Sequence, residues 1–108
     1  MTSSASDMQS LQPNVQRATR LLKLLASEHR LMILCRLFEG EASVSDLAEH
    51  LGQSIAGTSQ HLAKMRAEDL VATRRDGQTI YYALSDPAAK TVVSTLCHIY
   101  KGNDSITA

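Results

Sequence analysis

The chain has 108 residues, a length that suits one domain with a modest core and leaves no room for a second. Hydrophobic residues make up 44% of the chain and aromatic residues only 4%, so we expect an aliphatic, mainly helical core. Eleven basic and eleven acidic side chains cancel, so a basic binding surface has to arise from local clustering rather than from composition.

The sequence also limits the class of protein. No apolar run approaches the ~20 residues that span a bilayer, and residues 1–10 lack the apolar stretch of a signal peptide, so we expect a cytoplasmic protein without membrane contact. Two cysteines are too few for a disulfide framework. Because no nucleophile, base and orienting group are clustered, the sequence predicts neither an enzyme nor a cofactor.

A first helix is expected from residue 15, after a polar N-terminal tail (residues 1–14) that we expect to be disordered. Val15, Ala18, Leu22 and Leu25 recur at helical spacing, and neighbouring leucines widen this apolar stripe. The stripe has more apolar surface than one small core can bury, so we expect part of it to form a dimer contact.

Two capped helices follow. Ser27 is a suitable N-cap for a helix that ends at Gly40. Ser43 and Asp46 have the pattern of a capping box at the start of a shorter helix. That helix is expected to end at Gly52, because glycine adopts the left-handed conformation at little cost.

A fourth helix is expected from Ser54 to about Asp69, and β-forming residues follow it. They flank Asp76-Gly77, a pair that favours a two-residue hairpin turn of type I′. A turn on this pair places Arg75 opposite Gln78 and Thr73 opposite Ile80.

Asp86-Pro87 opens a last helix, whose apolar stripe runs from Ala89 to Tyr100. The predicted order is two helices, a helix-turn-helix, a β-hairpin and a final helix. This is a mainly α fold with a β-hairpin wing, a winged helix-turn-helix. It is expected to span residues 15–101 and to leave a frayed C-terminal tail at residues 102–108.

A helix-turn-helix within residues 43–70 indicates DNA binding. Small polar side chains near the start of its second helix allow close approach to base edges, and two arginines beside the hairpin turn suit phosphate or minor-groove contacts. On that helix the sequence pattern puts Ile55 and Leu62 on one side, and Gln60 and Lys64 on another. The predicted DNA-binding residues are Ser54, Ala56, Gly57, Thr58, Ser59, Gln60, His61, Lys64, Arg74, Arg75, Gln78 and Thr79.

These residues resemble a known family. Residues 59–71, from Ser59-Gln60-His61-Leu62 to Asp69-Leu70-Val71, are similar to the "SQHL…LR…GLV" motif of ArsR/SmtB repressors, and residues 74–82 are similar to their wing. The most similar branch contains the nodulation regulator NolR and the sulfide-responsive regulators. The resemblance covers residues 15–101. It implies a homodimer, joined through the first and last helices, that binds a pseudo-palindromic operator in double-stranded DNA.

The sequence departs from the family at three sites. Ile55 and Ala56 stand where the nodulation regulator has polar residues, so the operator sequence cannot be transferred. The metal-binding "CVC" motif is Ser43-Val44-Ser45, and hydroxyls are poor ligands for soft metals. In the last helix Asp86 and His98 remain, but two ligands do not close a tetrahedral zinc site. We therefore expect no metal, and the inducer is unknown.

Two alternative functions stay open. The resemblance to sulfide-responsive regulators makes Cys35 and Cys97 candidate redox-sensing residues, although Cys97 lies one helical turn, ~5.4 Å, before the matching position at Lys101. We prefer the interpretation of Cys35 as a buried, unreactive core thiol. A winged helix can also serve as a protein–protein interaction module, and the neutral net charge keeps that alternative open.

Overall fold

The computed structural model describes the backbone of residues 5–107 and the side chains of residues 7–100. Its helices are α1 (Ala5–Leu11), α2 (Val15–Leu25), α3 (Glu28–Glu39), α4 (Val44–Leu51), α5 (Ile55–Ala67) and α6 (Pro87–Thr107), and a 3-10 turn, η1 (Gln12–Asn14), joins α1 to α2. Within this part of the chain, the strands β1 (Ala42–Ser43), β2 (Val71–Asp76) and β3 (Thr79–Leu84) form an antiparallel sheet in the order β1-β3-β2. The fold is the expected mainly α structure with a β-hairpin wing.

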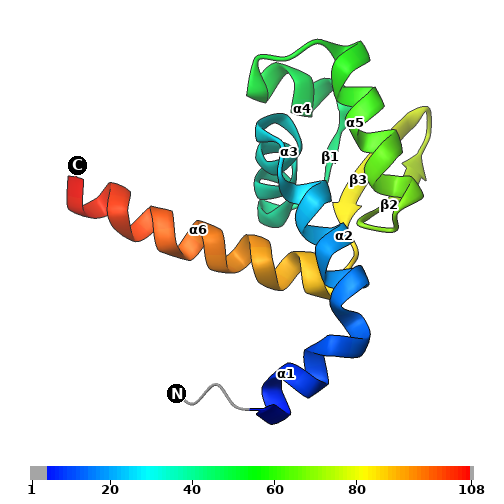
Figure 1. Ribbon diagram of the computed structural model, residues 1–108. Coiled ribbons are helices and arrows are strands. Elements are labelled where there is room, and N and C mark those ends of the chain that lie inside the picture. The colour runs from blue at the N-terminus through cyan, green and yellow to red at the C-terminus, as the bar shows by residue number, and fades with distance from the viewer. Residues whose placement is uncertain (1–4, 108) are drawn as a thin grey trace.

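The molecule consists of a body and two arms (Figure 1). α3, α4, α5 and the sheet form the body, α6 projects from it to one side, and α1 with the start of α2 extends from it in another direction. The radius of gyration is 15.9 Å, above the ~13 Å expected of a compact domain of this length. The arms therefore leave helix surface that a single chain does not cover.

Side-chain caps set the helix boundaries. The hydroxyls of Ser27, Ser43 and Ser54 each accept a hydrogen bond from the backbone N–H three residues further on, at 3.4, 3.1 and 2.9 Å. The Asp86 carboxylate does the same for α6 at 2.8 Å. Gly52 ends α4 with a φ of +65°, in the left-handed region. The helix starts and the stop predicted at these five residues are confirmed.

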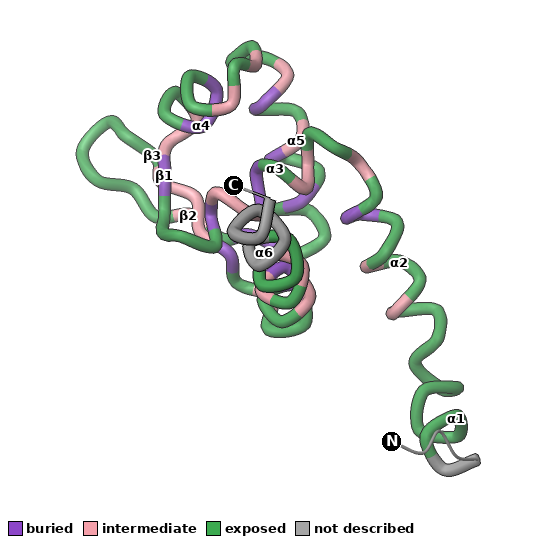
Figure 2. Tube along the Cα trace, turned by 90° about the vertical axis from the view of Figure 1, so that its left-hand side faces the viewer, coloured by how far each residue is buried: buried purple, intermediate pink, exposed green. Residues whose placement is uncertain are grey.

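The core lies where α3 and α5 meet the sheet and the first turns of α6. Figure 2 shows buried segments in the body, whereas residues 7–17 are exposed throughout. The large apolar side chains with no exposed surface among the described residues come from four helices, and none is aromatic: Ile33 and Leu34 of α3, Leu47 of α4, Leu62 and Met65 of α5, and Val93 of α6. This agrees with the aliphatic core expected from composition.

Both ends of the chain are more helical than expected. α1 and η1 occupy part of the segment expected to be a disordered tail, residues 1–14, and α6 continues to Thr107 through the segment expected to fray, residues 102–108. Asp7 in the first turn of α1 favours a helix there, because a carboxylate interacts well with a helix N-terminus. Residues 1–4 and Ala108 of these predicted tails lie outside the described residues.

The hairpin register differs from the prediction by two residues. Thr73 pairs with Tyr82 and Arg75 with Ile80, so the loop is Gly77-Gln78 rather than Asp76-Gly77. The reason is that, of these three residues, only Gly77 has a positive φ. A type I′ turn needs a positive φ at both loop positions, whereas a type II′ turn has glycine at the first, so the loop begins at Gly77. A shift of two residues keeps every side chain on its predicted face, because side chains alternate with a period of two.

Candidate nucleic-acid interface

α4 and α5 form the helix-turn-helix, and a tight turn joins them. The Gln53 N–H donates to the Ala48 carbonyl at 2.9 Å, which closes the turn after Gly52. Leu47 of α4 and Leu62 of α5 are fully buried, so core packing fixes the angle between the two helices. In Figure 1, α5 lies next to the β2–β3 hairpin, on the side of the body away from the free end of α6. The two elements predicted to bind DNA are thus neighbours.

The outer face of α5 carries small and polar side chains. Of the predicted residues, Ser54, Ala56, Ser59, Gln60 and Lys64 are exposed. The first turn of α5 has no acidic residue that would repel phosphate, and its last turn adds basic charge. These five positions have the surface access that a DNA contact requires.

Gly57 and Thr58 serve the helix rather than its outer surface. Thr58 has no exposed surface, and its hydroxyl donates to the Ser54 carbonyl at 2.7 Å. Its side chain therefore faces the core, and a DNA contact at Thr58 stays a prediction. Gly57 is half-buried, and a Cβ there would lie 3.0 Å from the Ser54 Oγ that accepts the Gly57 N–H. Glycine at this position leaves room for the cap of α5.

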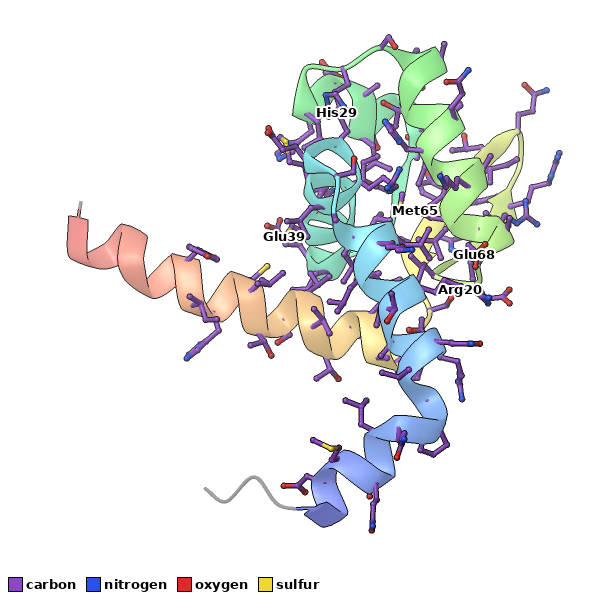
Figure 3. The ribbon with its side chains drawn as sticks, in the orientation of Figure 1. Arg20, His29, Glu39, Met65 and Glu68 are labelled. Carbon is purple, nitrogen blue, oxygen red and sulfur yellow. The ribbon has the colours of Figure 1, made fainter. Side chains whose placement is uncertain are left out.

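His61 turns toward α3 rather than outward. Its ring lies 5.6 Å from the ring of His29, which stands at the N-terminal end of α3 (Figure 3). Burial, with the nearby charges of Arg30, His29 and Lys64, holds the pKa of His61 below its ordinary value. His61 is therefore neutral near pH 7 and sits at the edge of the predicted interface, where Lys64 provides the exposed charge.

Arg74 in the wing is already paired. Its guanidinium forms a bidentate ion pair with the Glu41 carboxylate, with Nε 2.9 and 3.1 Å from the two oxygens, and it lies 4.8 Å above the ring of Tyr81. The hydrogen bonds of this pair raise the pKa of Arg74 and lower that of Glu41. Arg74 thus joins β2 to the residue before β1, and Glu41 offsets much of its charge.

Arg75 lies on the opposite face of the hairpin, beside its cross-strand neighbour Ile80. Arg75, Gln78 and Thr79 are all exposed near the hairpin tip. Because Arg75 has no carboxylate partner among the described contacts, its charge is available to a phosphate. Of the two wing arginines, Arg75 is the stronger candidate for a DNA contact.

The structure brings Cys35 of α3 and Cys97 of α6 together. Burial raises the pKa of the Cys35 thiol to about 11, and a hydrogen bond with Cys97 and the nearby Glu39 charge act in the same direction. Both thiols are free and half-buried. Cys35 also borders an open pocket of about 410 Å³ between α3 and α4. The offset of one turn along α6 therefore does not keep the two thiols apart.

The residues at the family's metal positions have other contacts here. Ser43 caps α4, and Asp86 caps α6. Among the residues whose side chains are described, no group of three His, Cys, Asp or Glu side chains could hold a metal ion. Over the same residues, no helix combines the length and apolar character needed to cross a membrane.

Sequence reasoning missed Glu41, Tyr81 and His29 as neighbours of the predicted site. Glu41 and His29 contact their partners across large separations along the chain, 33 residues for Glu41 and Arg74. The only local signal was the cross-strand neighbourhood of Arg74 and Tyr81, and the predicted register did not contain it.

The chain is similar to known proteins over most of its length. Residues 27–73 match the family model described as "Bacterial regulatory protein, arsR family". The chain is 40% identical over 94 residues to the transcriptional activator HlyU of Vibrio cholerae, covering 87% of each chain. It is 42% identical over 102 residues to the nodulation protein NolR of Rhizobium meliloti, covering 91% of this chain and 83% of NolR.

Solved structures show the same fold. Reduced HlyU from Vibrio cholerae superposes with a TM-score of 0.80 at 41% identity, covering 85% of this chain and 97% of HlyU. The transcriptional repressor BigR from Xylella fastidiosa superposes with a TM-score of 0.79 at 32% identity, covering 89% of this chain and 95% of BigR.

Proposed function

The chain belongs to the ArsR family and is a DNA-binding transcriptional regulator; on this basis we propose that it is a cytoplasmic, homodimeric repressor that binds a pseudo-palindromic operator without a metal ion. Residues 15–101 form the working domain in this proposal. The observation that carries it is the exposed outer face of α5 next to a wing whose Arg75 has no carboxylate partner among the side chains that the structure describes. Such a unit reads base edges with the helix and holds phosphates with the wing.

The arms support a homodimer. Large apolar side chains on α1 and α2 are exposed, with Leu22 at 60% and Val15 at 47%, and so are two on α6, Ile99 at 47% and Tyr100 at 60%. A second copy of the chain would cover these faces, and burying apolar surface is the main driving force for such association. Dimerisation through α2 and α6 would leave both copies of α5 free to contact successive major grooves, ~34 Å apart.

Repression needs only the DNA interface, because a regulator bound across a promoter excludes polymerase by occupying its site. The names of similar proteins include both an activator, HlyU, and a repressor, BigR. The direction of regulation is therefore tested separately, by in vitro transcription from a promoter that carries the selected operator. We expect transcript to fall as protein is added.

Thiol sensing remains an alternative for which the structure supplies one observation on each side. Contact between Cys35 and Cys97 would permit a bond between them, whereas the raised pKa of Cys35 opposes formation of the reactive thiolate. The adaptor alternative gains no support, because the similar proteins are transcriptional regulators.

Binding of duplex DNA by three variants tests the proposed roles. Gln60→Ala should relax sequence preference at one position of each half-site, at ~1–3 kcal/mol per lost base contact. Arg75→Gln should weaken binding to all sequences and lower the salt dependence, log Kd against log salt, by about one per protomer. Lys90→Gln, which removes an exposed charge from α6, is the matched control and should change neither.

Fluorescence anisotropy with operator and scrambled duplexes at two salt concentrations provides these values. Equal, sequence-independent losses from Gln60→Ala and Arg75→Gln would contradict the division of roles. A monomer in sedimentation at micromolar concentration would contradict the homodimer.

A further inference from the structure

Ile55 is the one large side chain at the start of α5, and its place there is unusual for an isoleucine. It is 58% exposed, although it begins a helix whose inner face holds Leu62 and Met65. The other exposed large hydrophobic side chains lie elsewhere: on the arms (Met8, Leu11, Val15, Leu22, Ile99, Tyr100), on α3 (Met32, Phe38) and on β3 (Ile80). The proposed dimer faces are on α2 and α6, so dimerisation does not account for Ile55.

Three hydrogen bonds hold the first turn of α5 and so fix where Ile55 points. The Gly57 N–H donates to Ser54 Oγ at 2.9 Å, and both the N–H and the hydroxyl of Thr58 donate to the Ser54 carbonyl, at 3.0 and 2.7 Å. Thr58 occupies the buried position one turn from the cap. Ile55 and Thr58 are three residues apart and share one side of the helix, so Ile55 is exposed through its place at the first residue of α5, on the surface of a rigid turn.

The surroundings of Ile55 allow close approach by a base. Its exposed neighbours Ala56 and Ser59 are small, and no carboxylate lies in the first turn of α5. An isoleucine side chain offers no hydrogen bond, so it can favour only an apolar group. In the major groove, the one apolar group on a base-pair edge is the C5-methyl group of thymine.

We propose that Ile55 is a specificity-determining residue that selects thymine, through its C5-methyl group, at the operator position facing the start of α5. The proposal rests on the proposed function, since it assigns one contact within the same DNA interface. With isoleucine at this position the helix favours an apolar group on the base, whereas a polar residue there would favour a base edge that forms hydrogen bonds.

A double-mutant cycle between protein and DNA tests the proposal. The operator is first selected from random duplexes with the wild-type protein, and each conserved thymine of a half-site is then replaced by uracil, which lacks only the methyl group. Replacing the thymine that faces Ile55 by uracil should weaken binding of the wild-type protein about fourfold per half-site, because burial of one methyl carbon contributes that factor to affinity. Ile55→Ala should bind the thymine operator more weakly and no longer distinguish thymine from uracil.

Controls separate the outcomes. Gln60→Ala should retain the thymine preference, and circular dichroism should show that Ile55→Ala keeps the helical content of the wild type. Equal affinity of the wild type for thymine and uracil at every operator position would overturn the role of Ile55 while leaving the operator intact. An equal preference in Ile55→Ala would overturn it as well. If selection enriches no sequence, the proposed function itself fails and this assignment fails with it.

Discussion

Asp69 lies between α5 and the wing in a conformation that suits glycine. Its φ is +62°, the only positive value of a residue other than glycine in the described part of the chain. Its contacts there are made by the backbone: its N–H donates to the Arg66 carbonyl at 3.0 Å, and its carbonyl accepts from the Ser85 hydroxyl at 3.3 Å. Glycine would keep both hydrogen bonds, and the family motif has glycine at this position.

The size of the effect follows from two opposing terms. The left-handed conformation costs an ordinary residue ~1–2 kcal/mol, and aspartate somewhat less. Glycine removes that cost but loses ~0.5–1 kcal/mol more conformational entropy on folding. We therefore expect Asp69→Gly to raise the free energy of unfolding by ~0.5 kcal/mol. Asp69→Ala should lower it by a similar amount, because alanine keeps the strain and lacks the local polar contacts that favour aspartate in this region.

Thermal unfolding followed by circular dichroism measures both variants. At ~4–8 °C per kcal/mol for a domain of this size, Asp69→Gly should melt ~2–4 °C above the wild type, and Asp69→Ala should melt below it. All samples need the same protein concentration, because the melting temperature of a dimer depends on it. Operator affinity should not change. If Asp69→Gly melts at or below the melting temperature of the wild type, the positive φ of Asp69 does not strain the folded chain.

Three further results are expected. Glu41→Gln should release Arg74 for a phosphate and steepen the salt dependence of DNA binding by about one per protomer; an equal increase in the Glu41→Gln/Arg74→Gln double variant would show that Arg74 is not the cause. At pH 8 iodoacetamide should alkylate Cys35 about a hundredfold more slowly than a thiol with the ordinary pKa of 9.0, because the pKa of Cys35 is about 11. The alkylation rate should rise tenfold per pH unit, and a rate that levels off below pH 9 would contradict the raised pKa. Leu22→Glu should dissociate the dimer in sedimentation equilibrium, whereas Ile80→Glu on the wing should leave it intact; the opposite pattern would place the dimer contact elsewhere.

Local signals were sufficient for the starts of α3, α4, α5 and α6 and for the end of α4. Each cap joins a side chain to a backbone group three residues away, so Ser27, Ser43, Ser54 and Asp86 could be identified from short stretches of sequence. The same applies to Gly52, whose left-handed conformation ends α4. The two-residue strand β1 carries no such pattern, since it exists only through pairing with β3.

Contacts between distant segments could not be read in this way. The pairing of Glu41 with Arg74 depends on β1 lying beside β3, and the contact of Cys35 with Cys97 depends on how α6 crosses α3. The one-turn offset of Cys97 was measured along a single helix axis. What brings the thiols together is the relative position of two helices, which an offset along one of them does not determine.

The exposure of Ile55 was the most informative departure from the sequence pattern, because that pattern places Ile55 on the inner side of α5. Ile55, Thr58, Leu62 and Met65 recur at spacings of three, four and three residues and so share one side of the helix, yet only the last three are buried and Ile55 is exposed. Burying a threonine is tolerable because its hydroxyl donates to the Ser54 carbonyl, and exposing an isoleucine forgoes burial worth ~1.5–3 kcal/mol. Folding alone would favour a polar side chain at the exposed position of Ile55. A local rule broken at the first turn of the helix that we propose reads DNA is where a functional constraint is expected. An apolar contact with DNA would bury, on binding, the surface that folding leaves exposed.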